Sequence, residues 1–364
     1  MAGKTRVLLI GCGGIGTITA LNLEASGQCH VTAVLRSNYE IVKERGFSID
    51  SLDHGKVEGY RPSEIRTTIP DLSKETVAPF DYIIVTTKNI PDVPPHLPSL
   101  IAPALTPGHS AILLIQNGLN IHIPFATAFP SVPILSGISR MGANELAPGV
   151  ILEDDPDRLS VGAFPATEGG DSPPSDAAVA AAKRFVELYA VSGKAVVEYN
   201  ANVKFERWRK LCYNATWNPV CALTGLDTGR LRLVGEKADP FSPVNLLLRP
   251  AMREVLRVAR ADGAVLAADA EAEEKLVEGV VEAEPLEVFC QPSMLQDAKK
   301  RRVWEVENLL GDVVRVAADK GVEVPALSAI YALAKGRMWA LKEDMGLINK
   351  DEEVRKRNEG IQGR

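Results

Sequence analysis

The sequence predicts an α/β domain followed by an all-helical domain. Short apolar runs typical of buried strands recur between residue 6 and residue 198. A glycine-rich turn and a helix-like stretch follow the first run, as in the βα units of parallel sheets. From residue 201 onward, longer stretches with helical periodicity replace the strands. We therefore expect the α/β domain at residues 1–200, the helical domain at 201–345 and a charged tail at 346–364.

The glycine-rich turn follows the first predicted strand, residues 6–10, and has the pattern Gly-x-Gly-x-x-Gly. It consists of Gly11, Cys12, Gly13, Gly14, Ile15 and Gly16, and the helix-like segment 17–26 comes next. Glycine lets such a turn tighten and lets a pyrophosphate approach the backbone N–H groups at the start of the helix. Strand, turn and helix in this order predict a dinucleotide-binding Rossmann domain. The alternative is a glycine-rich turn in an unrelated α/β domain.

The end of the second predicted strand, residues 31–35, indicates which dinucleotide is bound. An NAD-binding site normally places an acidic residue there to bind a ribose hydroxyl. This chain has Arg36, whose cation suits a 2′-phosphate, with Ser37 and Asn38 as further hydrogen-bond donors. The predicted cofactor is therefore NADPH.

Two polar residues lie at the carboxyl ends of later strands. These strands are predicted at residues 81–87, 111–115 and 132–135. Lys88 follows the first of them, and Asn117 follows the second within Gln116-Asn117-Gly118. Ligands of open parallel sheets bind beyond the carboxyl ends of strands, so both residues are candidate contacts for the cofactor or substrate. The alternatives are a solvated loop lysine and an Asn-Gly turn.

The remaining elements follow from composition and periodicity. A surface loop is expected at residues 162–176 and a last strand at 194–198. Later helices are predicted at residues 244–261, 294–320 and 326–341. Gly321 is expected to end one helix and Pro325 to lie in the first turn of the next. The charged chain from Asp351 onward is expected to fray.

The first helical segment, residues 208–223, carries one lysine and two asparagines at a spacing of four within apolar surroundings. On a continuous helix Lys210, Asn214 and Asn218 share one face. A partly buried ammonium is costly to leave unpaired, and a desolvated lysine can donate a proton near neutral pH. These residues are therefore candidates for catalysis and substrate binding. The alternative is a snorkelling lysine beside two capping amides.

A second polar group lies further along the helical half. Ser293 follows Pro292 and is expected as an N-cap or first-turn residue, with capping as its alternative role. Glu305 is expected within a helix, at the boundary between the apolar positions and the solvent-facing side, where an ordinary surface acid is the alternative.

Composition excludes several classes of function. With 41 basic and 47 acidic residues, a general nucleic-acid binder is not expected. The longest apolar runs fall short of the ~20 residues that span a membrane. The first strand begins close to Met1, so we expect no cleaved signal. The five cysteines form no Cys-x-x-Cys and the five histidines no paired spacing, which favours a cytoplasmic protein with reduced thiols and no metal.

Taken in order, these motifs resemble those of the ketopantoate reductases. The resemblance covers residues 6–340. It rests most on Lys210-x3-Asn214-x3-Asn218-Pro219 and on Ser293-Met-Leu-Gln-Asp with Glu305 twelve residues after the serine. It implies NADPH-dependent reduction of 2-dehydropantoate (ketopantoate) to pantoate, a step of pantothenate biosynthesis. It also implies a helical domain like that of 6-phosphogluconate dehydrogenase, and a homodimer formed through that domain.

The resemblance also implies a role for each motif residue. Lys210 would be the general acid, and Glu305 would bind the substrate hydroxyl or orient the lysine. Asn214 and Asn218 would hold the 2-oxo acid, and Ser293 would bind its carboxylate. Asn117 would lie near both the nicotinamide and the substrate, with Lys88 nearby.

Two departures from the family pattern bear on the substrate. Many members have asparagine where this chain has Cys290, and Thr228 occupies a position that is often another substrate-contacting asparagine. A family paralogue that reduces a different 2-oxo acid or ketone in a biosynthetic pathway is therefore an alternative. A non-catalytic NADP sensor is a second one, since fold does not fix function. A sensor would have no need of a proton donor, an acid and an amide pair together.

Overall fold

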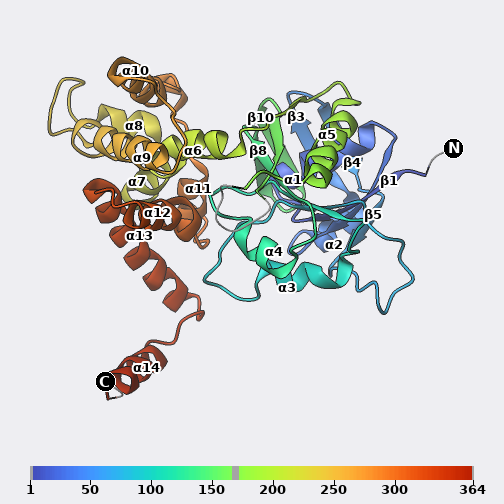
Figure 1. Ribbon diagram of the computed structural model, residues 1–364. Helices are drawn as coiled ribbons and strands as arrows, with labels where there is room; N and C mark the ends of the chain where they lie inside the picture. Colours follow the sequence, from blue (N-terminus) through green and yellow to red (C-terminus); the bar gives the residue numbers. More distant parts are fainter. Residues whose placement is uncertain (1–2, 166–171, 363–364) are drawn as a thin grey trace. The chain divides into compact units, whose positions relative to one another are not determined.

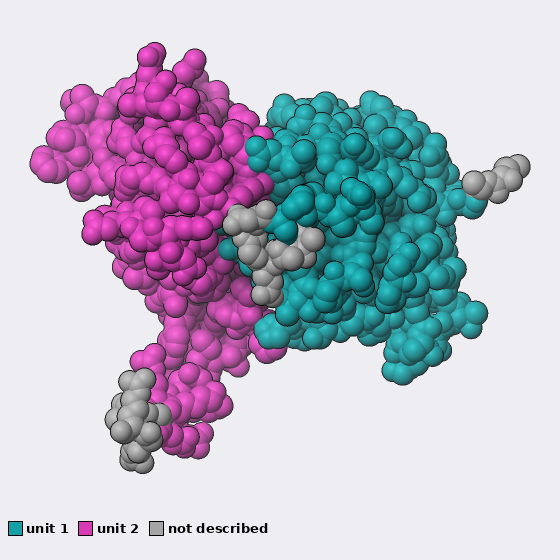
Figure 2. Space-filling model, in the orientation of Figure 1, with its two compact units in different colours: residues 1–89, 95–203 teal, residues 90–94, 204–364 magenta. Residues whose placement is uncertain are grey.

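The computed structural model describes residues 3–165 and 172–362 and divides the chain into two compact units. Unit 1 comprises residues 1–89 and 95–203, and unit 2 comprises residues 90–94 and 204–364 (Figure 2). The short segment 90–94 thus lies inside the first half of the sequence but belongs to the helical unit. There Asp92 forms an ion pair with Lys342, a lysine only 7% exposed.

The larger sheet of unit 1 is a doubly wound α/β sheet, as the sequence predicts (Figure 1). Among the described residues its order is β12-β11-β8-β7-β6-β1-β2-β5. These strands are β1 Thr5–Ile10, β2 Cys29–Val34, β5 Glu64–Arg66, β6 Tyr82–Val85, β7 Ala111–Leu114, β8 Ile134–Ser139, β11 Arg158–Ala163 and β12 Val196–Tyr199. Neighbours are parallel except for β8 and β11. Strand order changes direction at β1 and β6, and ligands of such sheets bind beyond the carboxyl ends of the strands at this point.

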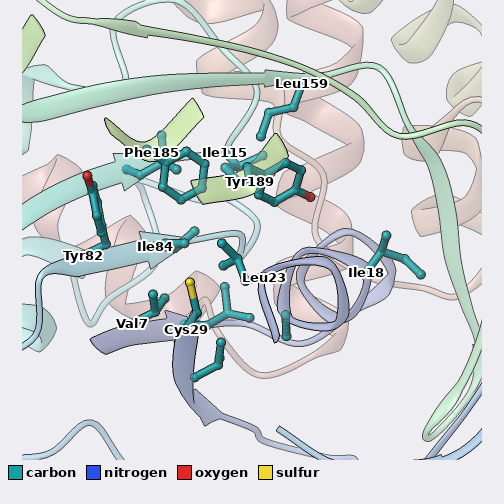
Figure 3. Close-up of a cluster of buried hydrophobic side chains, with 14 of the residues drawn as sticks. Val7, Ile18, Leu23, Cys29, Tyr82, Ile84, Ile115, Leu159, Phe185 and Tyr189 are labelled. Atoms are coloured by element: carbon teal, nitrogen blue, oxygen red, sulfur yellow. The ribbon is translucent and has the colours of Figure 1, made fainter. Parts of the chain in front are cut away.

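Apolar side chains cover both faces of this sheet. Val7 and Ile84 lie in a cluster with residues of α1 (Gly14–Ala25) and α5 (Asp176–Ala190) (Figure 3). Leu8 alternates with Val7 and packs on the opposite face, in the cluster that includes residues of α3 (Leu97–Ile101) and α4 (Ile123–Ala128). Because successive strand residues point to opposite faces, unbroken apolar strands are those covered on both sides.

A second, smaller sheet was not foreseen from the sequence. Its order is β4-β3-β10-β9, with β3 Phe47–Ser51, β4 Gly55–Tyr60, β9 Gly142–Ala147 and β10 Val150–Asp155. The strands β3 and β10 pair in parallel although about 100 residues separate them in the chain. Their mixed, half-exposed side chains lack the continuous apolar runs by which the other strands were predicted.

The predicted loop at 162–176 is only partly correct. Gly162 lies within β11, where a Cβ atom would overlap the Asn200 carbonyl, and Asp176 begins α5. Residues 166–171 lie outside the described part of the chain. The last predicted strand, 194–198, is found as β12. The remaining helices of unit 1 are α2 (Tyr39–Arg45) and the 3-10 turn η1 (Ala102–Ala104).

Unit 2 contains helices joined by loops, and its described residues include no strand. Its elements are α6 Val203–Asn214, α7 Trp217–Thr224, α8 Thr228–Leu233, η2 Val244–Leu248, α9 Arg249–Ala261, α10 Ala270–Val281, η3 Leu286–Val288, α11 Ser293–Lys299, η4 Glu307–Gly311, α12 Asp312–Asp319, α13 Pro325–Asp344 and α14 Lys350–Gln362. Gly321 has a positive φ after α12, and Pro325 begins α13, as predicted. None of the described helices is long and apolar enough to cross a membrane.

Two predictions for the chain after residue 290 differ from the structure. The helix expected at 294–320 is interrupted, because α11 ends at Lys299 and Arg301 has a left-handed φ of 51°. The tail expected to fray forms α14 instead. Lys356 pairs there with Glu352 and Glu353, both at 3.0 Å, and pairs spaced by three or four residues stabilise isolated helices.

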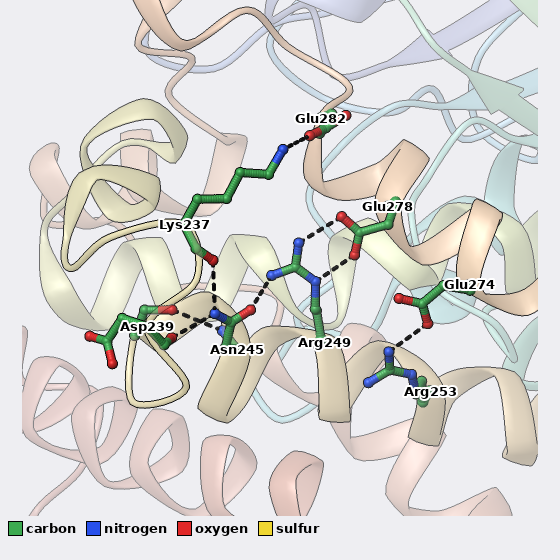
Figure 4. Close-up of polar contacts among 9 residues, drawn as sticks. Lys237, Asp239, Asn245, Arg249, Arg253, Glu274, Glu278 and Glu282 are labelled. Carbon is green, nitrogen blue, oxygen red and sulfur yellow. Dashed lines mark hydrogen bonds and ion pairs between the residues drawn. The ribbon is translucent and has the colours of Figure 1, made fainter.

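Charged pairs fasten α10 to α9 (Figure 4). The Arg249 guanidinium binds the Glu278 carboxylate through two hydrogen bonds of 2.5 and 2.7 Å. Arg253 binds Glu274 at 2.6 Å one turn further along α9. The bond to Arg249 lowers the pKa of Glu278, so this carboxylate stays charged and the bidentate pair persists near neutral pH.

Candidate active site

Three glycines of the turn after β1 are required by close packing. Gly11 has a φ of +99°, and a Cβ atom there would lie 2.7 Å from Thr87 Cγ2. A Cβ at Gly14 would overlap the Ala143 backbone of β9, and one at Gly16 would overlap the Gly11 carbonyl. These contacts hold the start of α1 against its neighbours at fixed distances.

Gly13 differs from the other three glycines because space surrounds it. No heavy atom lies within 4 Å of the Cβ that another residue would carry here, and Gly13 itself is exposed. It is the N-cap of α1, and no side chain caps this helix. The free N–H groups of a helix N-terminus attract phosphate. The space at Gly13 and the uncapped helix therefore fit the pyrophosphate of a dinucleotide.

Hydrogen bonds tie together the ends of the strands β1, β6 and β7. The Thr86 hydroxyl donates to the Gly11 carbonyl, and Gln116 Nε2 donates to the Thr87 carbonyl at 2.7 Å. Lys88 and Asn117 follow directly, the first exposed and the second half-buried. Because these strands are parallel neighbours, the glycine turn, Lys88 and Asn117 lie at one edge of the sheet. The structure thus brings together the candidate cofactor residues of unit 1.

Arg36 follows the carboxyl end of β2. The preceding Leu35 is buried, and its N–H donates to the Arg66 carbonyl at 2.8 Å, whereas Arg36 and Ser37 are exposed. No carboxylate among the described residues forms an ion pair with Arg36, so its guanidinium is available to an anion. Asn38 does not fit the expected role of a phosphate donor. It is 6% exposed, and its Nδ2 donates to the Cys12 carbonyl and to Glu145.

The structure corrects the single helix expected for Lys210, Asn214 and Asn218. Helix α6 ends at Asn214 and α7 begins at Trp217. Pro219 explains the break, because it has no N–H to donate to the carbonyl four residues earlier and its ring crowds that carbonyl. The Thr216 hydroxyl donates instead to the Cys212 carbonyl at 2.6 Å. Asn218 is therefore presented by a second helix, α7, and not by α6.

Asn218 is the most deeply buried of the three residues. It is 2% exposed, and its Oδ1 has no hydrogen-bond partner among the described residues. Asn214 is 7% exposed and Lys210 is half-buried. An unpaired buried acceptor costs roughly 1–3 kcal/mol, so native proteins keep one where a ligand or water supplies the donor.

Ser293 and Glu305 also belong to unit 2. Helix α11 packs against α7, which carries Asn218, and Ser293 is the exposed first residue of α11. Ser293 is thus a first-turn residue, with Pro292 as the N-cap. Glu305 does not lie within a helix as expected. It precedes η4, its carbonyl accepts from Leu309 N at 3.2 Å, and its side chain is buried at 5% exposure.

The two departures noted in the sequence contact each other. The backbone N–H and the hydroxyl of Thr228 both donate to the Cys290 carbonyl, at 3.1 and 3.3 Å. Thr228 therefore fixes the backbone before α11. No group of three or more His, Cys, Asp or Glu residues in the described part of the chain could hold a metal ion.

Comparison with known proteins gives a consistent result along the chain. The family described as "Ketopantoate reductase PanE/ApbA" matches residues 7–166, and "Ketopantoate reductase PanE/ApbA C terminal" matches residues 202–338. A Saccharomyces cerevisiae protein described as uncharacterized is 36% identical, over 96% of this chain and 98% of its own. Among solved structures, 2-dehydropantoate 2-reductase from Methylococcus capsulatus is 27% identical, with a TM-score of 0.73 over 92% of this chain and 97% of that one.

A further structure shares the fold. D-mandelate dehydrogenase, solved in a ternary structure with NADH and anilino(oxo)acetate, is 20% identical, with a TM-score of 0.73 over 93% of this chain and all of that one. At this identity the likeness concerns the fold alone.

Proposed function

Because the chain belongs to the ketopantoate reductase family, an oxidoreductase family, we propose that it reduces ketopantoate to pantoate with NADPH. The observation that supports this most is the buried, unpartnered Oδ1 of Asn218 within the Lys-Asn-Asn motif. A substrate hydroxyl can donate to that oxygen, whereas a purely structural asparagine would be paired within the protein.

Unit 1 supplies a binding site that suits NADPH. The uncapped start of α1 and the open space at Gly13 suit the pyrophosphate. The exposed Arg36 suits the 2′-phosphate, and Lys88 and Asn117 lie at the edge of the sheet that would take the nicotinamide end. When bound, the reduced nicotinamide supplies a hydride to the carbonyl carbon of the substrate.

Unit 2 supplies the proton and the contacts to the substrate. The Lys210 ammonium would donate a proton to the carbonyl oxygen as that oxygen gains negative charge. The carboxylate of Glu305 would accept a bond from the substrate hydroxyl or orient the lysine. Asn214 and Asn218 would bind the polar groups of the 2-oxo acid, and Ser293 its carboxylate.

A different 2-oxo acid is the second candidate substrate. One observation supports it: the Thr228 hydroxyl donates to the Cys290 carbonyl within the protein. A hydroxyl held in this way is a poorer partner for a substrate hydroxyl than a free amide. An alternative substrate would then carry fewer polar groups than ketopantoate.

The deciding experiment follows NADPH oxidation at 340 nm with purified protein. Ketopantoate is compared with a panel of 2-oxo acids that lack its hydroxyl, and pantoate formation is verified by mass spectrometry. Selective turnover of ketopantoate would support the proposal. Faster turnover of a hydroxyl-free acid would show that this acid, and not ketopantoate, is the substrate. NADPH binding without turnover of any panel member would contradict the reduction of a 2-oxo acid.

A further inference from the structure

The buried carboxamide of Asn38 connects two parts of the proposed cofactor site. One is the glycine turn, residues 11–16, and the other is Arg36 with Ser37, which we call the Arg36 corner. Its Nδ2 donates to the Cys12 carbonyl of the glycine turn at 2.9 Å and to Glu145 Oε1 on β9 at 2.9 Å. The same carboxylate oxygen accepts from Gly149 N at 3.1 Å. Asn38 lies two residues after Arg36. One side chain therefore ties the Arg36 corner both to the glycine turn and to the second sheet.

Asn38 is an N-cap residue that does not cap its helix. It precedes α2, but its side chain makes no capping hydrogen bond. Asparagine is among the most favoured N-cap residues because its oxygen can accept from the first turn. By contrast, Ser175 caps α5 by accepting from Ala178 N at 3.2 Å. The Asn38 amide instead reaches groups 26 and 107 residues away, so its long-range contacts replace the local one.

Without Asn38, the glycine turn would keep more contacts than the Arg36 corner. Contacts of Gly11 with Thr87, and of Gly14 with Ala143, fix the glycine turn independently. The Arg36 corner has fewer contacts of its own, since Arg36 and Ser37 are both exposed and the Arg36 carbonyl accepts one backbone hydrogen bond, from Tyr39 N at 3.2 Å. Loss of the Asn38 bonds should therefore release the Arg36 corner while the glycine turn stays in place.

We propose that Asn38 is a positioning residue that holds Arg36 where it can bind a 2′-phosphate, and so sets the preference for NADPH over NADH. This inference rests on the proposed function, because it requires a nicotinamide dinucleotide at the glycine turn. The pyrophosphate is common to both cofactors, and only the 2′-phosphate separates them. Release of the Arg36 corner should therefore weaken NADPH binding and leave NADH binding nearly unchanged.

The test is the ratio of the NADPH and NADH dissociation constants, measured by calorimetry on the full chain. Asn38→Ser keeps a good N-cap residue but is too short to reach both partners. We expect the NADPH Kd to rise roughly tenfold, the loss typical of one charge-assisted contact, and the NADH Kd to change less than about threefold. Ser175→Ala is the matched control. It removes a true cap from the same unit and should lower the melting temperature without changing the ratio.

A second pair of variants tests the bond itself. Asn38→Asp keeps the side-chain size but removes both donors and faces the Glu145 carboxylate, so the ratio of the NADPH Kd to the NADH Kd should rise at least as far as in Asn38→Ser. Adding Glu145→Gln supplies an amide that can donate to the new carboxylate and should bring the ratio part of the way back down to the wild-type value. A role limited to fold stability would give no such recovery.

Each outcome separates this inference from the proposed function. Suppose that the wild type prefers NADPH. If Asn38→Ser then weakens the binding of both cofactors equally, or leaves the ratio of their dissociation constants at the wild-type value, this inference alone is overturned. A wild type that prefers NADH, or binds neither cofactor, would overturn the cofactor assignment and the inference with it.

Discussion

The Tyr189 hydroxyl donates a 2.6 Å hydrogen bond to Asp157, a carboxyl group that is only 1% exposed. Glu153 is equally buried and accepts from the Ser51 hydroxyl. One oxygen of each carboxyl has no partner among the described residues. Burial raises the pKa of Asp157 to about 6 and that of Glu153 to about 7, although the hydroxyl bonds oppose the rise.

These carboxyl groups predict that the protein loses stability as pH rises from about 4 to about 7. A pKa raised in the folded state means that folding retains protons that the unfolded chain releases. The associated stability is complete below the unfolded values of 3.8 and 4.5 and is lost through the folded values. One pKa unit corresponds to about 1.4 kcal/mol, so a rise of about two pKa units corresponds to a loss on the order of 3 kcal/mol for each carboxyl.

Urea denaturation between pH 4 and pH 8 measures the slope of the free energy of unfolding against pH. Glu153→Gln should flatten it and make the protein more stable than wild type at pH 8. Asp154→Asn changes an exposed neighbour and should leave the slope as it is. A wild-type stability that rises steadily over this interval would contradict the prediction.

Lys210→Ala should abolish most turnover and leave cofactor binding intact. Loss of a general acid typically lowers kcat by about 10²- to 10⁴-fold. NADPH affinity should stay near the wild-type value because the cofactor residues belong to unit 1. The measurements are steady-state kinetics and calorimetry, with Arg209→Ala, an exposed neighbour on α6, as the control. Near wild-type kcat in Lys210→Ala would rule out its role as the acid.

Arg36→Asp should reverse the preference for the phosphorylated cofactor. The change removes the cation proposed for the 2′-phosphate and places a carboxylate that can accept from a ribose hydroxyl. We expect the NADPH Kd to rise at least about tenfold and the NADH Kd not to rise. Arg45→Asp, at the exposed end of α2, controls for the change in net charge. Unchanged NADPH affinity would exclude Arg36 as the phosphate ligand.

Gly13→Ala should leave folding intact, whereas Gly14→Ala should impair it. A methyl group at Gly13 meets no other atom, so the fold should be retained while cofactor affinity falls because the methyl occupies the pyrophosphate space. A methyl at Gly14 overlaps the Ala143 backbone and should destabilise unit 1. Thermal melts and NADPH titrations distinguish the two. Full NADPH affinity in Gly13→Ala would place the pyrophosphate elsewhere.

Asn218→Ala should impair substrate binding more than stability. Its Oδ1 is unpaired, so truncation removes little internal hydrogen bonding. Asn22 is the contrasting case, because its amide donates to the Tyr189 carbonyl at 2.9 Å. We expect Asn22→Ala to cost about 1–3 kcal/mol of stability, and Asn218→Ala to cost less but raise KM. The reverse order of stability losses would show that Asn218 is a structural residue.

Much of the fold could be predicted because its signals are local. Continuous apolar runs marked the central strands, which are buried on both faces, and the glycine pattern marked the turn after β1. Pro325 and Gly321 marked helix ends through their own backbone preferences. The candidate residues of unit 1 could be placed at one edge of the sheet because parallel neighbours end on the same side. The homodimer stays a prediction.

Only the tertiary structure decided the features that depend on distant residues. The second sheet forms because β3 pairs with β10, which lies about 100 residues later in the chain. Neither strand has a strong hydrophobic pattern of its own. Asn38 does not cap α2 but donates hydrogen bonds to Cys12 and Glu145, and no nearby sequence pattern predicts these bonds. Local sequence determines which backbone conformations are low in free energy. The packing of distant segments decides which buried polar groups form hydrogen bonds. The Asn38 amide is paired in this way, whereas Asn218 Oδ1 remains unpaired among the described residues.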